Sequence, residues 1–257
     1  LFDELTFERA ETGICLQTDT EALPCDERNL VCKAARLIME RYSITEGVKI
    51  TLRKRIPMAA GLAGGSSDAA AVFHGLNRMF ALGMDEKVMQ RLAVRIGADV
   101  PFCIVGGTMR SEGIGEILTP LPPVPEGIVL IAKPDVDVST KYVYDNLHVE
   151  TITRHPDIKA VEAAIRAGDG NGMCMHMENI LETVTERQYP VISEIKASLK
   201  KSGAKAALMS GSGPSVFGIF PTPEQAAAAC DALRKEGKAK HLHIAAFTDR
   251  GCREKRQ

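Results

Sequence analysis

A run of small residues from Pro57 to Ala70, PMAAGLAGGSSDAA, is the stretch of this sequence best suited to bind an anion. It follows the alternating segment VKITLRKRIP, which predicts a strand, and leads into an alanine-rich segment that predicts a helix from Ser67. Glycine lets backbone N–H groups approach an oxygen closely, and the first turn of a helix adds unpaired N–H donors and the positive end of the helix dipole. Strand, glycine turn and helix together predict a phosphate-binding loop.

Two serines at the expected start of the helix extend this interpretation. Ser66 and Ser67 occupy predicted cap positions, where a hydroxyl can bond a phosphate oxygen or help to hold Mg²⁺. In the simpler alternative Ser66 only caps the helix and the glycines only permit a tight turn. In either case Asp68 is expected to be a favourable acid in the first turn rather than a neighbour of the phosphate. Known motifs do not fit, because a P-loop needs Gly-Lys-Ser/Thr, no lysine lies between Lys54 and Lys87, and GxGxxG is absent.

A second glycine and serine turn lies in the segment MSGSGPSVFGIF. Gly211, Ser212 and Gly213 stand between two apolar segments that predict strands, so the turn predicts a hairpin. Taken alone it is a structural turn. Together with the first loop it favours a ligand cleft lined from both domains.

Asp99, in GADVPF, is the candidate acid–base residue. One interpretation is that it shapes or caps the turn before Pro101. The other is that its carboxylate, held near the phosphate loop, takes the proton from an attacking hydroxyl. That chemistry is phosphoryl transfer to an alcohol.

Hydrophobic periodicity predicts a mixed order of strands and helices. Strands are expected at 1–9, 13–19, 48–57, 102–107 (FCIVGG), 108–112, 115–121, 128–133, 205–210, 215–220 and 241–248, the second pairing with the first as a hairpin. Helices are expected at 28–42 with Asn29 as cap, at 67–82, at 85–97, within 140–199 and at 223–237.

The order of these elements predicts an α+β protein with two domains. The second half has the order β-α-β-β-α-β of a split βαβ, or ferredoxin-like, domain. The first half mixes hairpins with helices, which excludes a doubly wound parallel sheet. The segment LPPVPEG has three prolines in four residues, so we place the domain boundary there, with domains at 1–126 and 127–257.

Composition limits the classes of protein that fit. The chain has 257 residues, 45% of them hydrophobic, and a net charge of -1, so no basic surface indicates nucleic acid or an anionic membrane. Seven cysteines form no CxxC pair and no cluster with zinc spacing, which predicts reduced thiols and a cytoplasmic protein. No apolar run is long enough to span a bilayer.

These motifs resemble the GHMP kinase superfamily, whose nucleotide loop has the form Pro-x-x-x-Gly-Leu-x-(Gly)-Ser-Ser-x-Ala. Five stretches carry the resemblance in order across nearly all of the chain: PMAAGLAGGSSDAAA, GADVPF, EGIGEILTPL, KPDVDVSTKYVYDNL and SGSGPSVFGIF. The resemblance implies a two-domain GHMP kinase fold, with an N-terminal mixed β/α domain that binds ATP and a C-terminal ferredoxin-like domain.

The resemblance also implies an activity and its ligands. The expected reaction is ATP-dependent phosphorylation, with Mg²⁺, of the 2-hydroxyl of a cytidine-diphospho-methylerythritol in non-mevalonate isoprenoid biosynthesis. The expected partners are these small molecules alone, without nucleic acid or membrane, and the protein is expected to be a monomer or homodimer.

Site residues follow from the resemblance position by position. Asp99 is expected to be the catalytic base and to contact the substrate, with Ser67 helping to hold Mg²⁺. Asn29 and Lys33 are expected to border the adenosine pocket, although Lys33 fits a solvated helix lysine equally well. The expected substrate contacts are Thr140, Gly211, Ser212 and Gly213. The expected ATP-binding loop consists of Pro57, Ala59, Ala60, Gly61, Leu62, Ala63, Gly64, Gly65, Ser66 and Ser67.

One part of the family pattern is not found in this sequence. The family opens with a strand that bears a lysine and an asparagine, followed by a hairpin whose Tyr-His reads cytosine, and we expect the natural protein to carry these before Leu1. That lysine is the expected partner of Asp99. Two alternatives remain open: another small-alcohol kinase of the superfamily, of mevalonate or homoserine type, or a catalytically silent nucleotide-binding regulator of the same fold.

Overall fold

The computed structural model describes residues 1–153, 155–249 and 251–252, and the chain divides by internal contacts into two compact units. Unit 1 contains Leu1–Ile56, Ala63–Pro120 and the described residues from Thr248 onward. Unit 2 contains Pro57–Leu62 and Leu121–Phe247. The glycine-rich loop therefore contributes its first half to unit 2 and its second half to unit 1. The domain division after residue 126 stays a prediction.

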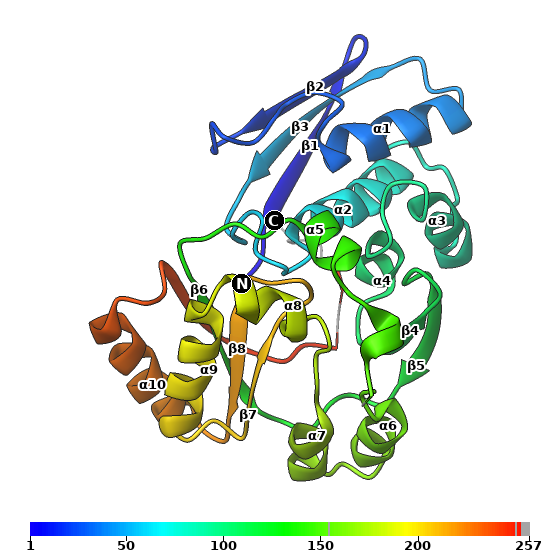
Figure 1. Cartoon of the computed structure of the whole chain (residues 1–257). Helices are drawn as coiled ribbons and strands as arrows, with labels where there is room; N and C mark the ends of the chain where they lie inside the picture. The colour runs from blue at the N-terminus through cyan, green and yellow to red at the C-terminus, as the bar shows by residue number, and fades with distance from the viewer. Residues whose placement is uncertain (154, 250, 253–257) are drawn as a thin grey trace. The chain divides into compact units, whose positions relative to one another are not determined.

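Unit 1 is built on a three-stranded sheet with the order β1-β3-β2, against which α1 and α2 pack (Figure 1). Val48, Ile50 and Leu52 of β3 alternate into this core and are fully buried. The elements of the unit are β1 (Glu4–Ala10), β2 (Ile14–Thr18), α1 (Leu30–Arg41), β3 (Gly47–Arg53), α2 (Gly64–Met79), α3 (Glu86–Ala93), α4 (Val100–Val105), β4 (Thr108–Glu112) and β5 (Ile117–Leu121), whose last residue falls in unit 2.

The expected hairpin between the first two strands is wrong. β1 pairs antiparallel with β3, and β2 pairs parallel with β3 on the other side. Alternation tells which face of a strand is buried but not which strand lies next to it. As the central strand, β3 has the most completely buried apolar face of the three. Its first residue, Gly47, packs so closely against the backbone of Thr12 that a Cβ would not fit.

The expected strand FCIVGG is also wrong, because this segment forms α4. Pro101 lies in the first turn of the helix, where its missing N–H costs no hydrogen bond. Gly106 ends the helix with φ +71°. Val100 and Ile104 are four residues apart and both buried, which is the spacing of one helix face.

Unit 2 has a four-stranded antiparallel sheet with the order β7-β8-β6-β9. In chain order these strands and their two crossover connections confirm the predicted split βαβ arrangement. The elements are β6 (Ile128–Lys133), α5 (Thr140–Asp145), the 3₁₀ helix η1 (Val149–Thr151), α6 (Ile158–Arg166), α7 (Gly170–His176), α8 (Glu182–Gln188), α9 (Val191–Lys201), β7 (Ala206–Met209), β8 (Val216–Phe220), α10 (Pro223–Glu236) and β9 (His241–Ala246).

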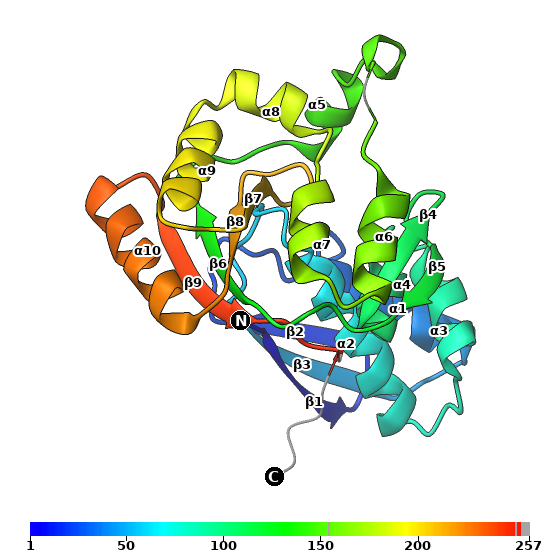
Figure 2. The ribbon, with the colours of Figure 1, turned by 90° about the horizontal axis from the view of Figure 1, so that it is seen from below.

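The sheet of unit 2 is covered on both faces, and its strands alternate accordingly. α9 and α10 pack on one face over Val216 and Phe220. α6 and α7, which lie side by side in Figure 2, pack with Leu208 and Ile219 from the other face. The two units confirm the predicted α+β class.

Two further sequence expectations can be compared with the described residues. All seven cysteines are free thiols, as expected. Within residues 1–153, 155–249 and 251–252, no helix is both long enough and apolar enough to cross a membrane. The cellular location stays a prediction.

Candidate active site

The second half of the glycine-rich loop forms the start of α2 in unit 1. The helix begins at Gly64 rather than Ser67, so the cap positions predicted for Ser66 and Ser67 are wrong, and both serines lie in the first turn. Gly64 packs closely against its neighbours, since a Cβ there would lie 2.9 Å from Nζ of Lys54. Ala63 takes the N-cap position with φ +51°.

The amino terminus of α2 offers unpaired donors. Ala63 makes no side-chain capping bond. The first bond along the helix runs from the N–H of Ser67 to the carbonyl of Ala63 at 2.9 Å, so the N–H groups of Gly64, Gly65 and Ser66 have no acceptor within the helix. Such a helix start can bind a phosphate group.

Ser67 is compatible with a cation held beside that phosphate. Its hydroxyl donates to the carbonyl of Gly64 at 2.9 Å, which leaves oxygen lone pairs available. Across the residues that the structure describes, no group of three or more His, Cys, Asp or Glu side chains is placed to hold a metal ion. Mg²⁺ is commonly bound through waters, substrate phosphates and one or two carboxylates, and the Ser67 hydroxyl can add one oxygen ligand to such a set.

The first half of the loop packs, within unit 2, against the second glycine turn. Ser210 Oγ donates to the carbonyl of Gly61 at 2.8 Å, and the N–H of Ser215 donates to the carbonyl of Ala60 at 3.3 Å. Ala60 is buried, Pro57 and Leu62 are half-buried, and Ala59 has φ +47°. Two turns whose bonded residues, Gly61 and Ser210, are 149 positions apart in the sequence are therefore in contact.

The second turn forms the predicted hairpin between β7 and β8. Ser212 is buried, and its hydroxyl lies 2.9 Å from that of Thr140, the first residue of α5. Gly211 is exposed and Gly213 is buried, and both have positive φ. The structure thus brings together all four residues expected to contact the substrate from unit 2.

Asp99 lies in unit 1 immediately before α4. Its side chain is exposed and makes no capping bond. The pKa of the Cys103 thiol is raised to about 12, first by burial and then by nearby charges that include those of Asp99 and Asp68. α4 packs against α2, and the exposed Asp99 carboxylate at the start of α4 is available to a ligand.

The two residues expected at the adenosine pocket differ in their surroundings. Asn29 is buried and caps α1, since its Oδ1 accepts the N–H of Val31 at 2.9 Å and its Nδ2 donates to the carbonyl of Pro24 at 2.8 Å. Lys33 is exposed on α1. The predicted cap is confirmed, and contact of either residue with adenosine stays a prediction.

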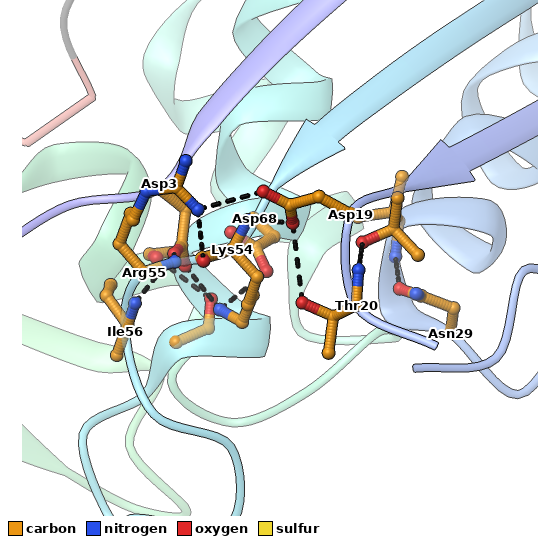
Figure 3. Close-up of polar contacts among 12 residues, drawn as sticks. Asp3, Asp19, Thr20, Asn29, Lys54, Arg55, Ile56 and Asp68 are labelled. Carbon is orange, nitrogen blue, oxygen red and sulfur yellow. Dashed lines mark hydrogen bonds and ion pairs between the residues drawn. The ribbon is translucent and has the colours of Figure 1, made fainter. Parts of the chain in front are cut away.

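A buried charge cluster beside the loop is absent from the sequence predictions (Figure 3). Lys54 Nζ forms ion pairs with Asp3 and, at 3.0 Å, with Asp68, and all three side chains are at most 6% exposed. Asp3 also accepts the N–H groups of Arg55 (2.5 Å) and Ile56 (2.8 Å). Asp68 is thus part of a buried ion cluster, and the expectation that it serves as an acid of the first turn is wrong, because α2 begins at Gly64.

Two carboxylates share one ammonium in this cluster, which leaves one negative charge in excess. Burial raises the pKa of Asp68 to about 7, because the opposing effect of Lys54 is smaller and the charge of Asp3 adds to the effect of burial. One carboxylate oxygen of Asp68 is buried without a hydrogen-bond partner among the described residues. A neutral, protonated Asp68 relieves this excess charge.

Asp68→Asn is expected to change how folding stability depends on pH. The folded protein binds the Asp68 proton more tightly than the unfolded chain, so the free energy of unfolding falls as pH rises from about 4 to about 7. Asparagine removes this titration, so the difference in unfolding free energy between pH 5 and pH 8 should shrink by more than about 1 kcal/mol. Urea unfolding at pH 5 and at pH 8 measures this difference in unfolding free energy.

Asp231→Asn, at an exposed residue of α10, serves as the control for this measurement. It removes one carboxylate without touching the buried cluster. Equal pH dependence in wild type and Asp68→Asn would show that Asp68 does not hold a proton in the folded state.

Comparison with known proteins places the chain in a family. Residues 29–107 match the GHMP kinases N terminal domain and residues 153–239 match the GHMP kinases C terminal domain. The 4-diphosphocytidyl-2-C-methyl-D-erythritol kinase of Acetivibrio thermocellus is 48% identical over 91% of this chain and 83% of that protein. The enzyme of the same name from Lachnospira eligens is 45% identical over 95% of this chain and 85% of that protein.

Solved structures agree with this assignment. A crystal structure of 4-(cytidine 5'-diphospho)-2C-methyl-D-erythritol kinase has a TM-score of 0.78 at 33% identity, covering 95% of this chain and 84% of that one. Homoserine kinase from Cytophaga hutchinsonii has the same TM-score and coverage at 22% identity, and shows the shared fold alone. The chain belongs to the GHMP kinase family and, within it, to the ATP-dependent 4-diphosphocytidyl-2-C-methyl-D-erythritol kinases.

Proposed function

We propose that this protein transfers the γ-phosphoryl group of ATP to the 2-hydroxyl of 4-(cytidine 5'-diphospho)-2-C-methyl-D-erythritol, with Asp99 as the general base. The products are the 2-phosphate and ADP, in the non-mevalonate route to isoprenoid precursors. Membership of the family supports the reaction. The observation that carries the site assignment is the start of α2 within the glycine-rich loop, where no side chain caps the helix.

The start of α2 provides the proposed site for the ATP phosphates. The N–H groups of Gly64, Gly65 and Ser66 and the positive end of the helix dipole stabilise negative charge that develops during transfer. Pro57–Leu62 complete the loop, and Asn29 and Lys33 border the adenosine. Side chains larger than those of glycine, alanine and serine would obstruct the approach of phosphate oxygens.

Ser67 is the residue proposed to contact Mg²⁺ through its hydroxyl oxygen. When bound, the ion supplies charge neutralisation between the phosphates of ATP. Substrate binding and proton transfer are assigned to side chains and backbone groups of the protein. The substrate phosphates are placed at the turn of Gly211, Ser212 and Gly213, with Thr140 beside it.

Asp99 accepts the proton of the substrate hydroxyl as the hydroxyl oxygen attacks the γ-phosphorus and the bond from that phosphorus to the bridging oxygen of ADP breaks. The proton then resides on a carboxylate oxygen of Asp99. An exposed side chain that caps no helix is free to rotate toward a bound hydroxyl, which supports this role.

Release of ADP by the protein tests the proposal. The protein is assayed with Mg-ATP and one of three alcohols: the cytidylyl substrate, mevalonate or homoserine. Turnover with the cytidylyl substrate alone is expected. Turnover with either of the others would assign a different small-alcohol kinase, and ATP binding without turnover on any alcohol would assign a silent regulator of the same fold.

A further inference from the structure

Asn179, which precedes α8, forms hydrogen bonds to the second glycine turn. Its Nδ2 donates to two carbonyl oxygens, those of Met209 and Gly211, each at 2.8 Å. Its Oδ1 accepts the N–H of Leu181 at 3.0 Å, so the side chain is itself anchored to the start of α8. All polar atoms of this carboxamide are engaged.

Two neighbours on α8 hold the same turn. Glu182 Oε1 accepts the N–H of Met209 at 2.7 Å, and the other carboxylate oxygen of Glu182 pairs with Lys196 at 2.5 Å. Thr185 is fully buried, and its hydroxyl lies 3.2 Å from the carbonyl of Ser212. Side chains of α8 therefore stabilise one face of the turn. The glycines of the turn cannot contribute side-chain hydrogen bonds of their own.

The hydrogen bond from Asn179 to the carbonyl of Gly211 also orients the N–H of Ser212, which forms no hydrogen bond within the turn. A trans peptide directs its C=O and its N–H to opposite sides, so fixing the carbonyl of Gly211 toward Asn179 directs the N–H of Ser212 away from α8. In the part of the chain that the structure describes, the N–H groups of Gly211 and Ser212 have no hydrogen-bond acceptor. Successive free N–H groups in a turn form an anion-binding concavity.

The same turn also supports the first half of the nucleotide loop. Ser210 Oγ and the N–H of Ser215 hold the carbonyls of Gly61 and Ala60. A shift of the turn therefore moves both the proposed substrate donors and part of the loop.

We propose that Asn179 is a positioning residue for phosphoryl transfer, which holds the N–H of Ser212 toward a phosphate of the substrate through its bond to the carbonyl of Gly211. This inference rests on the proposed function for the identity of the anion. Thr185, whose hydroxyl lies 3.2 Å from the carbonyls of both Leu181 and Ser212, adds a second point of support for the turn.

Asn179→Ala is the first test of this inference. We expect kcat to fall by about tenfold and the KM for the cytidylyl substrate to rise by a similar factor, because two hydrogen bonds that hold the turn are lost. The KM for ATP should also rise, but by a smaller factor, because Ser210 and Ser215 keep their own bonds to the nucleotide loop. A merely structural role would lower the amount of folded protein and leave the KM for both substrates unchanged in the folded fraction.

Conservative variants separate the hydrogen bonds from packing. Asn179→Asp keeps the shape but places oxygen against two carbonyl oxygens, so it should be at least as impaired as Asn179→Ala. Thr185→Ser keeps the hydroxyl and should retain more activity than Thr185→Val. Asn171→Ala, at an exposed residue of α7, is the control and should match wild type.

Amide hydrogen exchange gives a readout that needs no turnover. In Asn179→Ala we expect faster exchange in peptides that cover residues 209–215 and 57–62, and unchanged exchange in β6 and α10. Unchanged exchange at 209–215, or a KM for the cytidylyl substrate equal to that of wild type, would overturn the inference. A wild-type protein without kinase activity would instead overturn the proposed function.

Discussion

Asp99→Asn is expected to lower kcat by about 10²-fold or more, while the Kd for ATP changes by less than about twofold. Asparagine has the shape of aspartate but cannot accept the proton of the attacking hydroxyl. Because the Asp99 side chain is exposed and caps no helix, the substitution removes no hydrogen bond of the fold that the structure records. Steady-state ADP release measures kcat, and titration calorimetry measures ATP binding.

Asp85→Asn is the matched control for this experiment. Asp85 precedes α3 as Asp99 precedes α4, but its carboxylate accepts the N–H of Val88 at 2.7 Å and so caps the helix. Asparagine is an equally good cap, so kcat should equal that of wild type. If Asp99→Asn behaves like Asp85→Asn, the role of Asp99 is that of a turn residue, and the base must be another group.

Elements with a strong local signal were predictable from the sequence. α1 has apolar residues at helical spacing and a capping asparagine, Asn29, whose bond to Val31 the structure contains. The strands and helices of unit 2 were found because each strand alternates between two covered faces and each is bounded by turn residues. In these segments local propensity and tertiary packing agree.

Elements whose structure depends on distant contacts were not predictable in the same way. A six-residue apolar run such as FCIVGG fits a buried strand as well as a buried helix, and Pro101 and Gly106 were the overlooked signals of a short helix. The position of β3 between β1 and β2 follows from a long-range pairing that alternation does not specify.

The candidate site likewise has a part that local sequence predicts and a part that depends on distant contacts. The glycine-rich loop has a composition that indicates its chemistry, whereas the buried cluster beside it depends on register. Glu4 lies opposite Arg53, and this pairing brings Asp3 next to Lys54. Asn179 was missed because an asparagine before a helix ordinarily caps it, and its bonds to a turn 30 residues away have no local signature.

Gly61→Ala is expected to lower kcat/KM for ATP by about 10²-fold, because it displaces the loop from the turn that supports it. Gly61 has φ +68°, which L-residues adopt at a cost of about 1 kcal/mol. A Cβ at this position would also lie 2.8 Å from the carbonyl oxygen of Gly213 and still closer to that of Ser210. Both neighbours are backbone atoms of a turn held by α8, so the loop must move instead.

Gly168→Ala separates backbone strain from this steric clash. Gly168 belongs to the same unit and has the same φ of +68°, but a Cβ there would meet no atom within 4 Å. It should lose about 1 kcal/mol of stability and keep the kcat/KM of wild type. If Gly61→Ala loses no more activity than Gly168→Ala, contact between the two glycine turns is not needed for catalysis, because the loop then works without its support.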